Sequence, residues 1–363
     1  MTIVVVLFWL ALGALVWTHV LYPLVAALAA RLFPYRVRRG DVLPSVSLVV
    51  AAHNEEAVIA RKLENLRALD YPEEKLELVV VSDASTDRTD ELVRNAGVRL
   101  VRAERGGKVA AQDRGVAETT GEVVAFSDAN SMWDPDALRL LVRSFADPRV
   151  AYVCGKLAYE AADGTNREGL YWRYELWLRD SESRLSSVTG GNGAIYAVRR
   201  EDYAGGDPRF GHDLGFPYLM VQRGKRAVFE PAAVAREPLA TDVGDEWGRK
   251  VRMFSQCWGH VLTGRMLKPV TPVYALELFS HRLLRYASGI LHVVLLATSI
   301  ALISHGWIYD VALGAQLGVL AAAALGVGIA RYYVAITAAT LVGLWNYARR
   351  GAPRTWDPAE GTR

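Results

Sequence analysis

The N-terminal end of the 363-residue chain is an apolar run that limits what the chain can fold into. Residues 2–30 contain no Asp, Glu, Lys or Arg, and a helix needs roughly 20 apolar residues to cross the hydrocarbon core of a bilayer. The basic residues follow this run, whereas a cleaved signal peptide begins with them. They are Arg31, Arg36, Arg38 and Arg39. Because Lys and Arg favour the cytoplasmic side, the sequence predicts a membrane-spanning helix followed by a cytoplasmic domain.

Apolar runs return in the C-terminal third. Residues 286–304 and 307–330 are uncharged or nearly so, and each is long enough to span a bilayer. A shorter run, residues 332–347, can cross, re-enter or lie flat. Upstream, residues 277–286 mix apolar and basic positions, as helices lying in the membrane interface do, although a solvated helix shows the same pattern. The sequence therefore predicts an interfacial helix and two or three C-terminal membrane segments in an integral inner (plasma) membrane protein.

Between these ends, short β-branched runs alternate with helical stretches. This alternation predicts an α/β domain with a mostly parallel sheet and helices on both faces. The runs interpreted as strands are SVSLVVAA, LELVVVSD, VRLV, EVVAFSD and RVAYVCG. The expected domains are a membrane helix with a basic segment at residues 1–40, the α/β domain at 41–265 and the interfacial helix with the C-terminal membrane segments at 266–363.

Composition excludes some classes of partner. The chain has 42 Lys+Arg against 39 Asp+Glu, so no strong basic field exists to bind nucleic acid. Its two cysteines, Cys154 and Cys257, fit no metal or redox spacing. They are expected to be thiols of the core in a reducing compartment.

Two acidic residues end predicted strands. Asp83 closes ELVVVSD and Asp128 closes EVVAFSD, and ligands of parallel sheets bind beyond the carboxyl ends of the strands. Asn130 follows Asp128 by two positions in an extended turn, so both side chains can point the same way. Oxygen ligands suit Mg²⁺ or Mn²⁺, which neutralises the charge of a leaving nucleotide. Either aspartate alone can equally be a helix cap or a turn residue.

A glycine pair lies between the two acidic strands. Gly106 and Gly107 allow close approach of a ligand to the backbone, and Lys108 then stands at a predicted helix N-terminus, where anions are favoured. In isolation, a glycine pair is also common in the turn before a helix.

Together with three further fragments, these motifs carry a resemblance. The ordered set is SLVVAAHNEE, VVVSDASTDRT, RGGKVAAQDRG, VVAFSDAN, TGGNGAIYAVRRE and GHDLGFPYLMVQRGKRAVFEP. It resembles the family 2 glycosyltransferases with a GT-A fold, and the ends of the chain resemble the membrane-embedded branch that includes poly-N-acetylglucosamine, cellulose and hyaluronan synthases. The resemblance implies a cytoplasmic GT-A domain, Rossmann-like and flanked by transmembrane helices. It also implies an inverting enzyme that moves a sugar from a nucleotide-diphosphate donor, expected to be UDP-linked, to a polysaccharide or lipid-linked acceptor.

The resemblance also assigns expected roles on the donor side. The residues expected to line the uracil and ribose site are Ala51, His53, Glu55 and Asp83. Lys108 is expected near the donor pocket, and Asp128 and Asn130 occupy the metal-binding motif. The family usually has a second aspartate where this chain has Asn130, so weaker binding of the cation, Mg²⁺ or Mn²⁺, is expected.

On the acceptor side, Asp213 of GHDLG matches the general base, and His212 replaces an acid beside it. The loop expected to face the acceptor consists of Gly190, Gly191, Asn192 and Gly193. Processive members carry Q-x-x-R-W further on, where this chain has Arg249 to Met253. Arg252 keeps the arginine that contacts the diphosphate. Met253 cannot stack on a sugar as a Trp does, so processive synthesis requires a substitute such as Trp258.

Two other classes of function remain open from the sequence. A nucleotidyltransferase also needs a nucleotide site and a metal, but its usual Gly-rich opening after the first strand is missing. An inactive relative acting as an assembly subunit is conceivable because of Asn130, His212 and Met253. The expected partners are a nucleotide-sugar donor, a glycan or polyprenyl-linked acceptor and the bilayer. Few helices enclose little channel volume, so secretion of a product requires self-association or an export partner.

Overall fold

The computed structural model describes residues 1–160, 169–207, 209–238 and 243–352, which divide into two compact units. The α/β unit consists of Ala26–Asp245 and Met266–Tyr274 within those ranges. The apolar unit consists of Met1–Val25, Glu246–Arg265 and Ala275–Ala352. The domain boundaries expected from the sequence, after residues 40 and 265, stay predictions.

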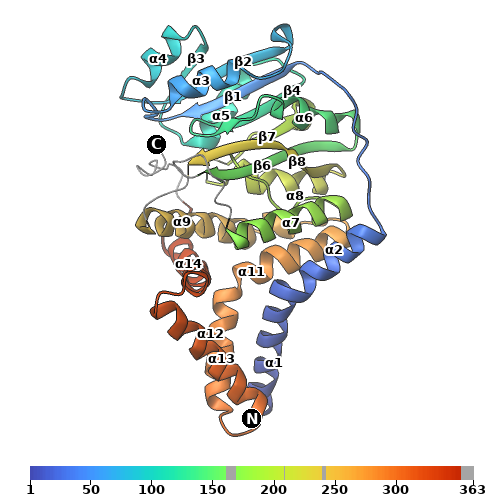
Figure 1. Cartoon of the computed structure of the whole chain (residues 1–363), viewed down its shortest axis with the longest axis vertical. Helices are drawn as coiled ribbons and strands as arrows, with labels where there is room; N and C mark the ends of the chain where they lie inside the picture. Colours follow the sequence, from blue (N-terminus) through green and yellow to red (C-terminus); the bar gives the residue numbers. More distant parts are fainter. Residues whose placement is uncertain (161–168, 208, 239–242, 353–363) are drawn as a thin grey trace. The chain divides into compact units, whose positions relative to one another are not determined.

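The α/β unit is built around one mixed sheet (Figure 1). Its described strands are β1 (Val46–Ala52), β2 (Leu76–Asp83), β3 (Arg99–Ala103), β4 (Val123–Asp128), β5 (Met132–Trp133), β6 (Val150–Glu160), β7 (Ile195–Arg199) and β8 (Arg226–Pro238). They take the spatial order β3-β2-β1-β4-β7-β6-β8-β5. The first four in this order are parallel, whereas β7 runs antiparallel to both β4 and β6. The five strands predicted from the sequence are present, and the sheet is parallel only in part.

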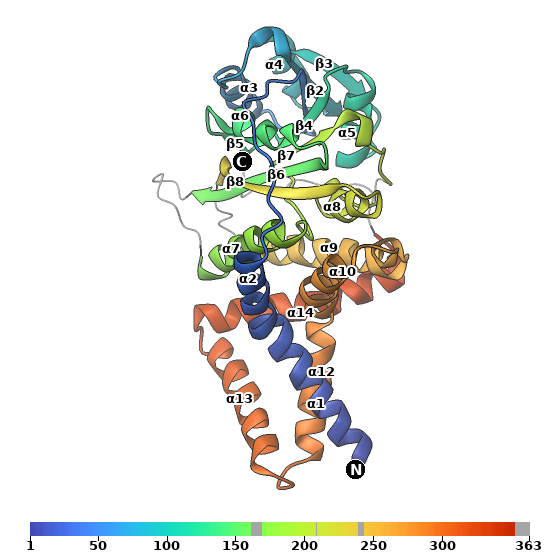
Figure 2. The ribbon, with the colours of Figure 1, turned by 90° about the vertical axis from the view of Figure 1, so that its right-hand side faces the viewer.

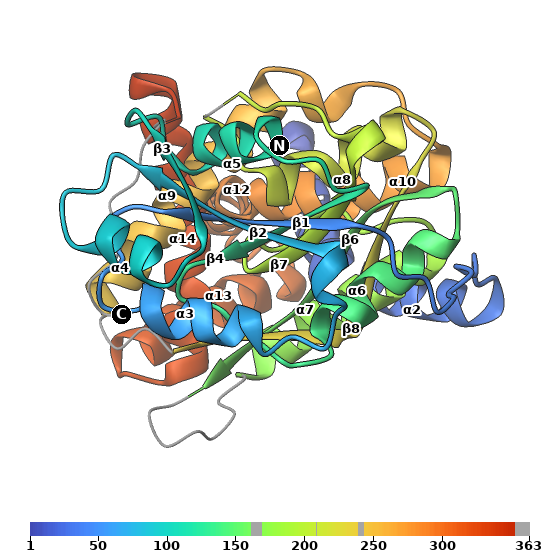
Figure 3. The ribbon, with the colours of Figure 1, turned by 90° about the horizontal axis from the view of Figure 1, so that it is seen from above.

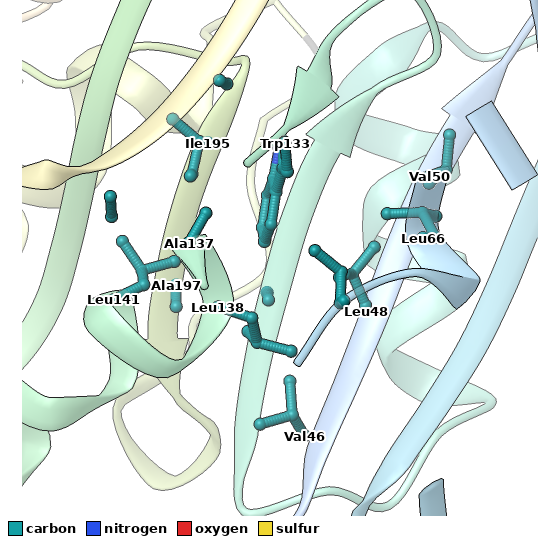
Figure 4. Close-up of a cluster of buried hydrophobic side chains, with 14 of the residues drawn as sticks. Val46, Leu48, Val50, Leu66, Trp133, Ala137, Leu138, Leu141, Ile195 and Ala197 are labelled. Atoms are coloured by element: carbon teal, nitrogen blue, oxygen red, sulfur yellow. The ribbon is translucent and has the colours of Figure 1, made fainter. Parts of the chain in front are cut away.

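Helices cover both faces of this sheet (Figure 3). They are α3 (Ile59–Arg67), α4 (Thr89–Asn95), α5 (Lys108–Ala117), α6 (Ala137–Val142), α7 (Leu170–Leu185) and α8 (His212–Gln222). On one face α3, α4 and α6 share an apolar core with even-numbered positions of β1, such as Leu48 and Val50 (Figure 4). On the other face α5 and α8 share a second apolar core with odd-numbered positions of β1, such as Val49. The strands are apolar on both sides because both faces are covered.

The apolar unit consists of helices. Its longer helices are α1 (Thr2–Val16), α9 (Val243–Leu262), α12 (Ser288–Ala301), α13 (Trp307–Ala324) and α14 (Gly328–Arg350). Helices α1 and α12 lie side by side (Figure 2), with Phe8 and Leu15 packed against Leu295 and Leu302. Cys257 of α9 and Cys154 of β6 in the other unit are both buried and are not joined in a disulfide, as expected from the sequence.

Three stretches of the described chain are long and apolar enough to cross a membrane: Thr2–Leu32, Trp307–Ala324 and Gly328–Arg350. The expected span at residues 286–304 contains α12, which has 14 residues and reaches spanning length only together with Pro272–Tyr286. Those two segments are bent by 63°, so they form either a broken span or a re-entrant loop. The short run at residues 332–347 lies within the 23-residue α14.

Candidate active site

The two strand-ending aspartates lie at the same edge of the sheet, on either side of β1. Ala51 is in register with Asp128 of β4, and Ala52 is in register with Ser82 of β2. Asp83 is therefore the next residue along this carboxyl edge. Ligands of open α/β sheets bind at such an edge, so both aspartates stand where the sequence places them.

Asp83 is completely buried and holds the loop that precedes α5. Its carboxylate accepts backbone N–H groups from Gly106 (2.7 Å) and Gly107 (3.0 Å), and Arg105 Nη1 lies 2.5 Å from it. Gly107 has a φ of +89°, which side chains other than glycine rarely adopt. Asp83 thus fixes the entry into α5, and its contact with a donor stays a prediction.

Lys108, the first residue of α5, forms an ion pair with Asp128. The two side chains are 28% and 29% exposed, so the pair is partly accessible to solvent. Burial alone lowers the pKa of a lysine, but Asp128, then Asp213 and Glu237, outweigh burial and raise the pKa of Lys108 above its usual value. Lys108 is therefore positively charged, and both Asp128 and Asp213 stabilise that charge.

The glycine loop of residues 190–193 lies against both Asp128 and Asp213. A Cβ atom at Gly193 would lie 2.6 Å from Lys108 Nζ and 3.3 Å from Asp128 Oδ2. Gly191 donates its N–H to the carbonyl oxygen of Asp213 over 2.7 Å, and a Cβ at Gly191 would overlap the hydroxyl of buried Tyr152. The loop therefore needs glycines because it passes closely between the Lys108–Asp128 pair and Asp213.

Asp213 is the second residue of α8 and is partly exposed. The preceding His212 points into the protein, where it stacks on Phe216 with ring centroids 4.3 Å apart. The His212 Nδ1 atom lies 3.3 Å from the Tyr196 hydroxyl, and Nε2 lies 3.4 Å from Asp113. His212 is thus a core residue, and Asp213 is the acid that this turn presents.

The other residues expected to contact the donor or the acceptor are engaged in contacts within the protein. Ala51 is buried, the His53 ring nitrogen Nδ1 lies 2.7 Å from the carbonyl oxygen of Asp83, and Glu55 bonds Thr89 through its backbone N–H. The carboxamide of Asn192 shapes the glycine loop, because it donates to Gly155 O and accepts from the N–H groups of Ala194 and Ile195. Direct contacts of these residues with substrates stay predictions.

Arg252 and Trp258 lie on α9, in the apolar unit. Trp258 is 9% exposed and donates its indole N–H to the carbonyl oxygen of Thr340 on α14 over 2.9 Å. Met253 is exposed. The indole of Trp258 therefore packs within its own unit, and the expected roles of Arg252 at the diphosphate and Trp258 at the acceptor stay predictions.

Lys62 of α3 was not singled out in the sequence. It is completely buried, and its ammonium donates to Ser127 Oγ over 2.7 Å and to the carbonyl oxygen of Ser131. Burial lowers the pKa of Lys62 from 10.5 to about 7, although Asp128 and Glu237 act in the opposite direction. Its sequence signal is a lysine among the buried positions Ile59, Leu63 and Leu66.

Asp128 and Asn130 at the carboxyl edge can supply only part of the ligand set of a divalent cation, so ligand oxygens would have to complete the site. No group of three or more His, Cys, Asp or Glu residues in the described ranges is placed to hold a metal. Asp128 and Asn130 still offer a carboxylate and an amide oxygen two residues apart, and both are partly exposed. Mg²⁺-type sites commonly use one or two carboxylates, several waters and substrate phosphates. Such a site has few protein ligands by nature.

Comparison with known proteins agrees with this geometry. Residues 47–204 match the family described as "Glycosyl transferase family 2". A beta-monoglucosyldiacylglycerol synthase from Synechocystis sp. is 34% identical over 180 residues, which are 45% of this chain and 37% of that protein. A poly-beta-1,6-N-acetyl-D-glucosamine synthase from Staphylococcus aureus is 24% identical over 58% of this chain and 54% of that protein. The chain thus spans about a third to a half of the length of these curated relatives.

A solved structure matches almost the whole chain. The mannosyltransferase PcManGT from Pyrobaculum calidifontis, in complex with GDP-Man and Mn²⁺, is 25% identical and superimposes with a TM-score of 0.76. The match covers 96% of this chain and 98% of that one. The fold predicted from the sequence, a GT-A domain with apolar helices at both ends, is thereby confirmed. The chain therefore contains a domain of glycosyl transferase family 2, matched at residues 47–204, and has the GT-A fold.

Proposed function

We propose that this chain is an inverting glycosyltransferase that moves a sugar from a nucleoside-diphosphate donor to an acceptor hydroxyl carried by a membrane lipid or glycan. The observation that carries the proposal is the glycine loop of residues 190–193. Gly193 lies against the Lys108–Asp128 pair, and Gly191 donates its N–H to the main-chain carbonyl oxygen of Asp213. One loop therefore keeps a cationic side chain suited to phosphate close to the partly exposed Asp213, as transfer from a diphosphate requires.

In this reaction the Asp213 carboxylate takes the proton of the acceptor hydroxyl. The acceptor oxygen forms a bond to the anomeric carbon while the bond from that carbon to the phosphate oxygen breaks, and the nucleoside diphosphate leaves with the bonding electrons. Lys108 faces the charge that develops on the leaving diphosphate. Asp128 and Asn130 would hold a divalent cation, which would supply further charge neutralisation. Attack opposite the leaving group inverts the anomeric configuration.

The comparisons favour particular substrates. The mannosyltransferase that matches nearly the full chain was solved with GDP-Man and Mn²⁺. A GDP-linked hexose is therefore a second candidate donor, beside the UDP-linked sugar expected from the resemblance. The Synechocystis relative is named for a diacylglycerol product, which supports a lipid acceptor. The apolar stretches, together with the arginines that follow the first of them, support an integral inner membrane protein with its α/β unit in the cytoplasm.

The test is turnover of labelled donors by the full chain in detergent with membrane lipids. GDP-mannose, UDP-glucose and UDP-N-acetylglucosamine are compared with Mn²⁺ and with Mg²⁺. We expect release of nucleoside diphosphate and labelling of lipid or polymer for one donor. Asp213→Asn should lower this rate by about 10²- to 10⁴-fold. The matched control Asp41→Asn removes an acid that is 86% exposed and should keep the rate.

Three outcomes would overturn the proposal. Pyrophosphate release would identify a nucleotidyltransferase. Full activity of Asp213→Asn would remove the assigned base. Absence of turnover with every donor, in a protein that retains its thermal transition, would favour an assembly subunit.

A further inference from the structure

We propose that Lys62 is a positioning residue that clamps the cation-binding turn of residues 128–130. The inference rests on the proposed function, because that function assigns Asp128 and Asn130 to the cation. The ammonium of Lys62 donates to Ser127 Oγ on one side of the turn and to the carbonyl oxygen of Ser131 on the other. A single side chain thus fixes both ends of the segment that carries the cation ligands.

The clamp continues into the two neighbouring parts of the unit. Ser127 Oγ lies 3.2 Å from the carbonyl oxygen of Ala194, the residue that follows the glycine loop. Ser131 Oγ donates to a carboxylate oxygen of Glu237 near the end of β8. Lys62 therefore anchors a chain of hydrogen bonds that joins the cation turn to the glycine loop and to β8.

Helix α3 is itself fixed to the same segment. Asn65, one turn after Lys62, accepts the backbone N–H of Trp133 and donates to its carbonyl oxygen, both over 2.8 Å. The Lys62 ammonium also lies 5.5 Å from the centroid of the Trp133 ring. Residues 131 and 133 are thus held from one helix, which leaves the cation turn little freedom to move.

Stability alone does not explain a lysine here. Lys62 is 0% exposed, and its hydrogen-bond acceptors are a hydroxyl and a carbonyl, both neutral. Burial of a charge without a direct carboxylate partner is costly, and an apolar residue of similar volume commonly costs less. Its neighbours on the same helix face are Ile59, Leu63 and Leu66, so an apolar residue would suit the core. A costly lysine directly behind the cation turn points to a role in function.

The experiment measures cation binding independently of turnover. The full chain in detergent is titrated with Mn²⁺ in the presence of GDP and of UDP, and free Mn²⁺ is followed by electron paramagnetic resonance. Residues that support metal ligands typically change affinity by 10- to 100-fold, so Lys62→Met should weaken Mn²⁺ binding at least about tenfold. Its melting temperature at pH 6.5 should be unchanged or higher. If Lys62 served stability alone, Lys62→Met would lower the melting temperature and leave Mn²⁺ affinity unchanged.

Lys75→Met is the matched control, because Lys75 is exposed and also donates to a backbone carbonyl, that of Leu43. It should leave Mn²⁺ affinity unchanged. If Lys62→Met does not fold, Ser127→Ala removes one acceptor of the clamp and should weaken Mn²⁺ binding several-fold.

The outcomes separate this inference from the proposed function. Unchanged Mn²⁺ affinity in a folded Lys62→Met protein, or in Ser127→Ala where Lys62→Met does not fold, overturns the clamp. A wild-type chain that transfers sugar but binds no Mn²⁺ also overturns the clamp and leaves the function standing. A wild-type chain that binds Mn²⁺ through this clamp but transfers no sugar retains the inference and loses the function.

Discussion

The ammonium of Lys108 is bound to the carboxylate of Asp128, the same group that is proposed to hold a divalent cation. A cation and an ammonium compete for this carboxylate because each is favoured by its negative charge. If Asp128 holds the cation as proposed, cation binding would release Lys108, which would then be available to pair with the diphosphate. The ion pair would thereby couple cation binding to donor binding at the start of α5.

This coupling predicts opposite effects of Lys108→Met on two ligands. Without nucleotide, Mn²⁺ affinity should rise several-fold because the competing ammonium is gone. Affinity for the nucleoside diphosphate should fall about tenfold or more, since a charged hydrogen bond contributes about 1.5–3 kcal/mol. Titration of the detergent-purified chain with Mn²⁺ and with GDP or UDP measures both.

Lys225→Met supplies the control for that experiment. Lys225 also pairs with an aspartate, Asp202 at 3.4 Å, but it lies in the turn before β8. Both affinities should be unchanged in this variant. Weaker Mn²⁺ binding in Lys108→Met would show that Lys108 supports the cation site, contrary to the competition argued here.

A second prediction concerns the close contact below the glycine loop. A Cβ at Gly191 would overlap the hydroxyl of Tyr152, and that hydroxyl has no hydrogen-bond partner among the described residues. Gly191→Ala should therefore destabilise the α/β unit by about 1–3 kcal/mol through overpacking. Tyr152→Phe alone should be nearly neutral, and in the double variant it should restore part of the lost stability.

Thermal unfolding of the four proteins gives the coupling energy of this pair. Gly169→Ala is the control, because a Cβ there meets nothing within 4 Å. Strict additivity of the two changes would contradict the contact between Gly191 and Tyr152.

Much of the site was predictable because it follows from strand ends. An apolar run that closes in an acid identifies Asp83 and Asp128, and parallel pairing with β1 then brings the two acids to one edge. Gly193 and Asp213 were found by resemblance, and their contacts with Lys108 and Gly191 needed the fold. Local patterns identify which residues end strands, but they do not reveal partners distant in the chain.

Other features left no clear local signal. Strand β7 has only five residues and directly follows the glycine loop, and it is not among the five strands that the sequence predicts. It lies in the middle of the sheet because β4 and β6 both pair with it antiparallel. The sequence around Lys62 does not predict its burial, because a single lysine beside Leu63 is also typical of the solvated flank of a helix. Only the packing of α3 on the sheet shows that this lysine is buried.

The last prediction concerns stability and pH. Burial lowers the pKa of Lys62 to about 7 in the folded protein, against 10.5 for an ordinary lysine. Below pH 7 the group is protonated in both the folded and the unfolded chain, so the folded protein bears the full cost of the buried charge. Between pH 7 and 10.5 only the unfolded chain keeps the proton. The free energy of unfolding therefore rises with pH in this range, by at most about 1.4 kcal/mol per pH unit from this group.

Comparison with Lys62→Met isolates this contribution, because every other titrating group is shared by the two proteins. The melting temperature of the wild type minus that of Lys62→Met should increase between pH 6.5 and 8.5, by a few degrees if about 1–2 kcal/mol is gained. Scanning fluorimetry of both proteins in one detergent measures this difference. A difference that stays constant with pH would mean that Lys62 keeps its proton throughout the range. Nearby carboxylates such as Asp128 and Glu237 would then outweigh burial, and the lysine would be held as a charged partner of the cation turn at every pH tested.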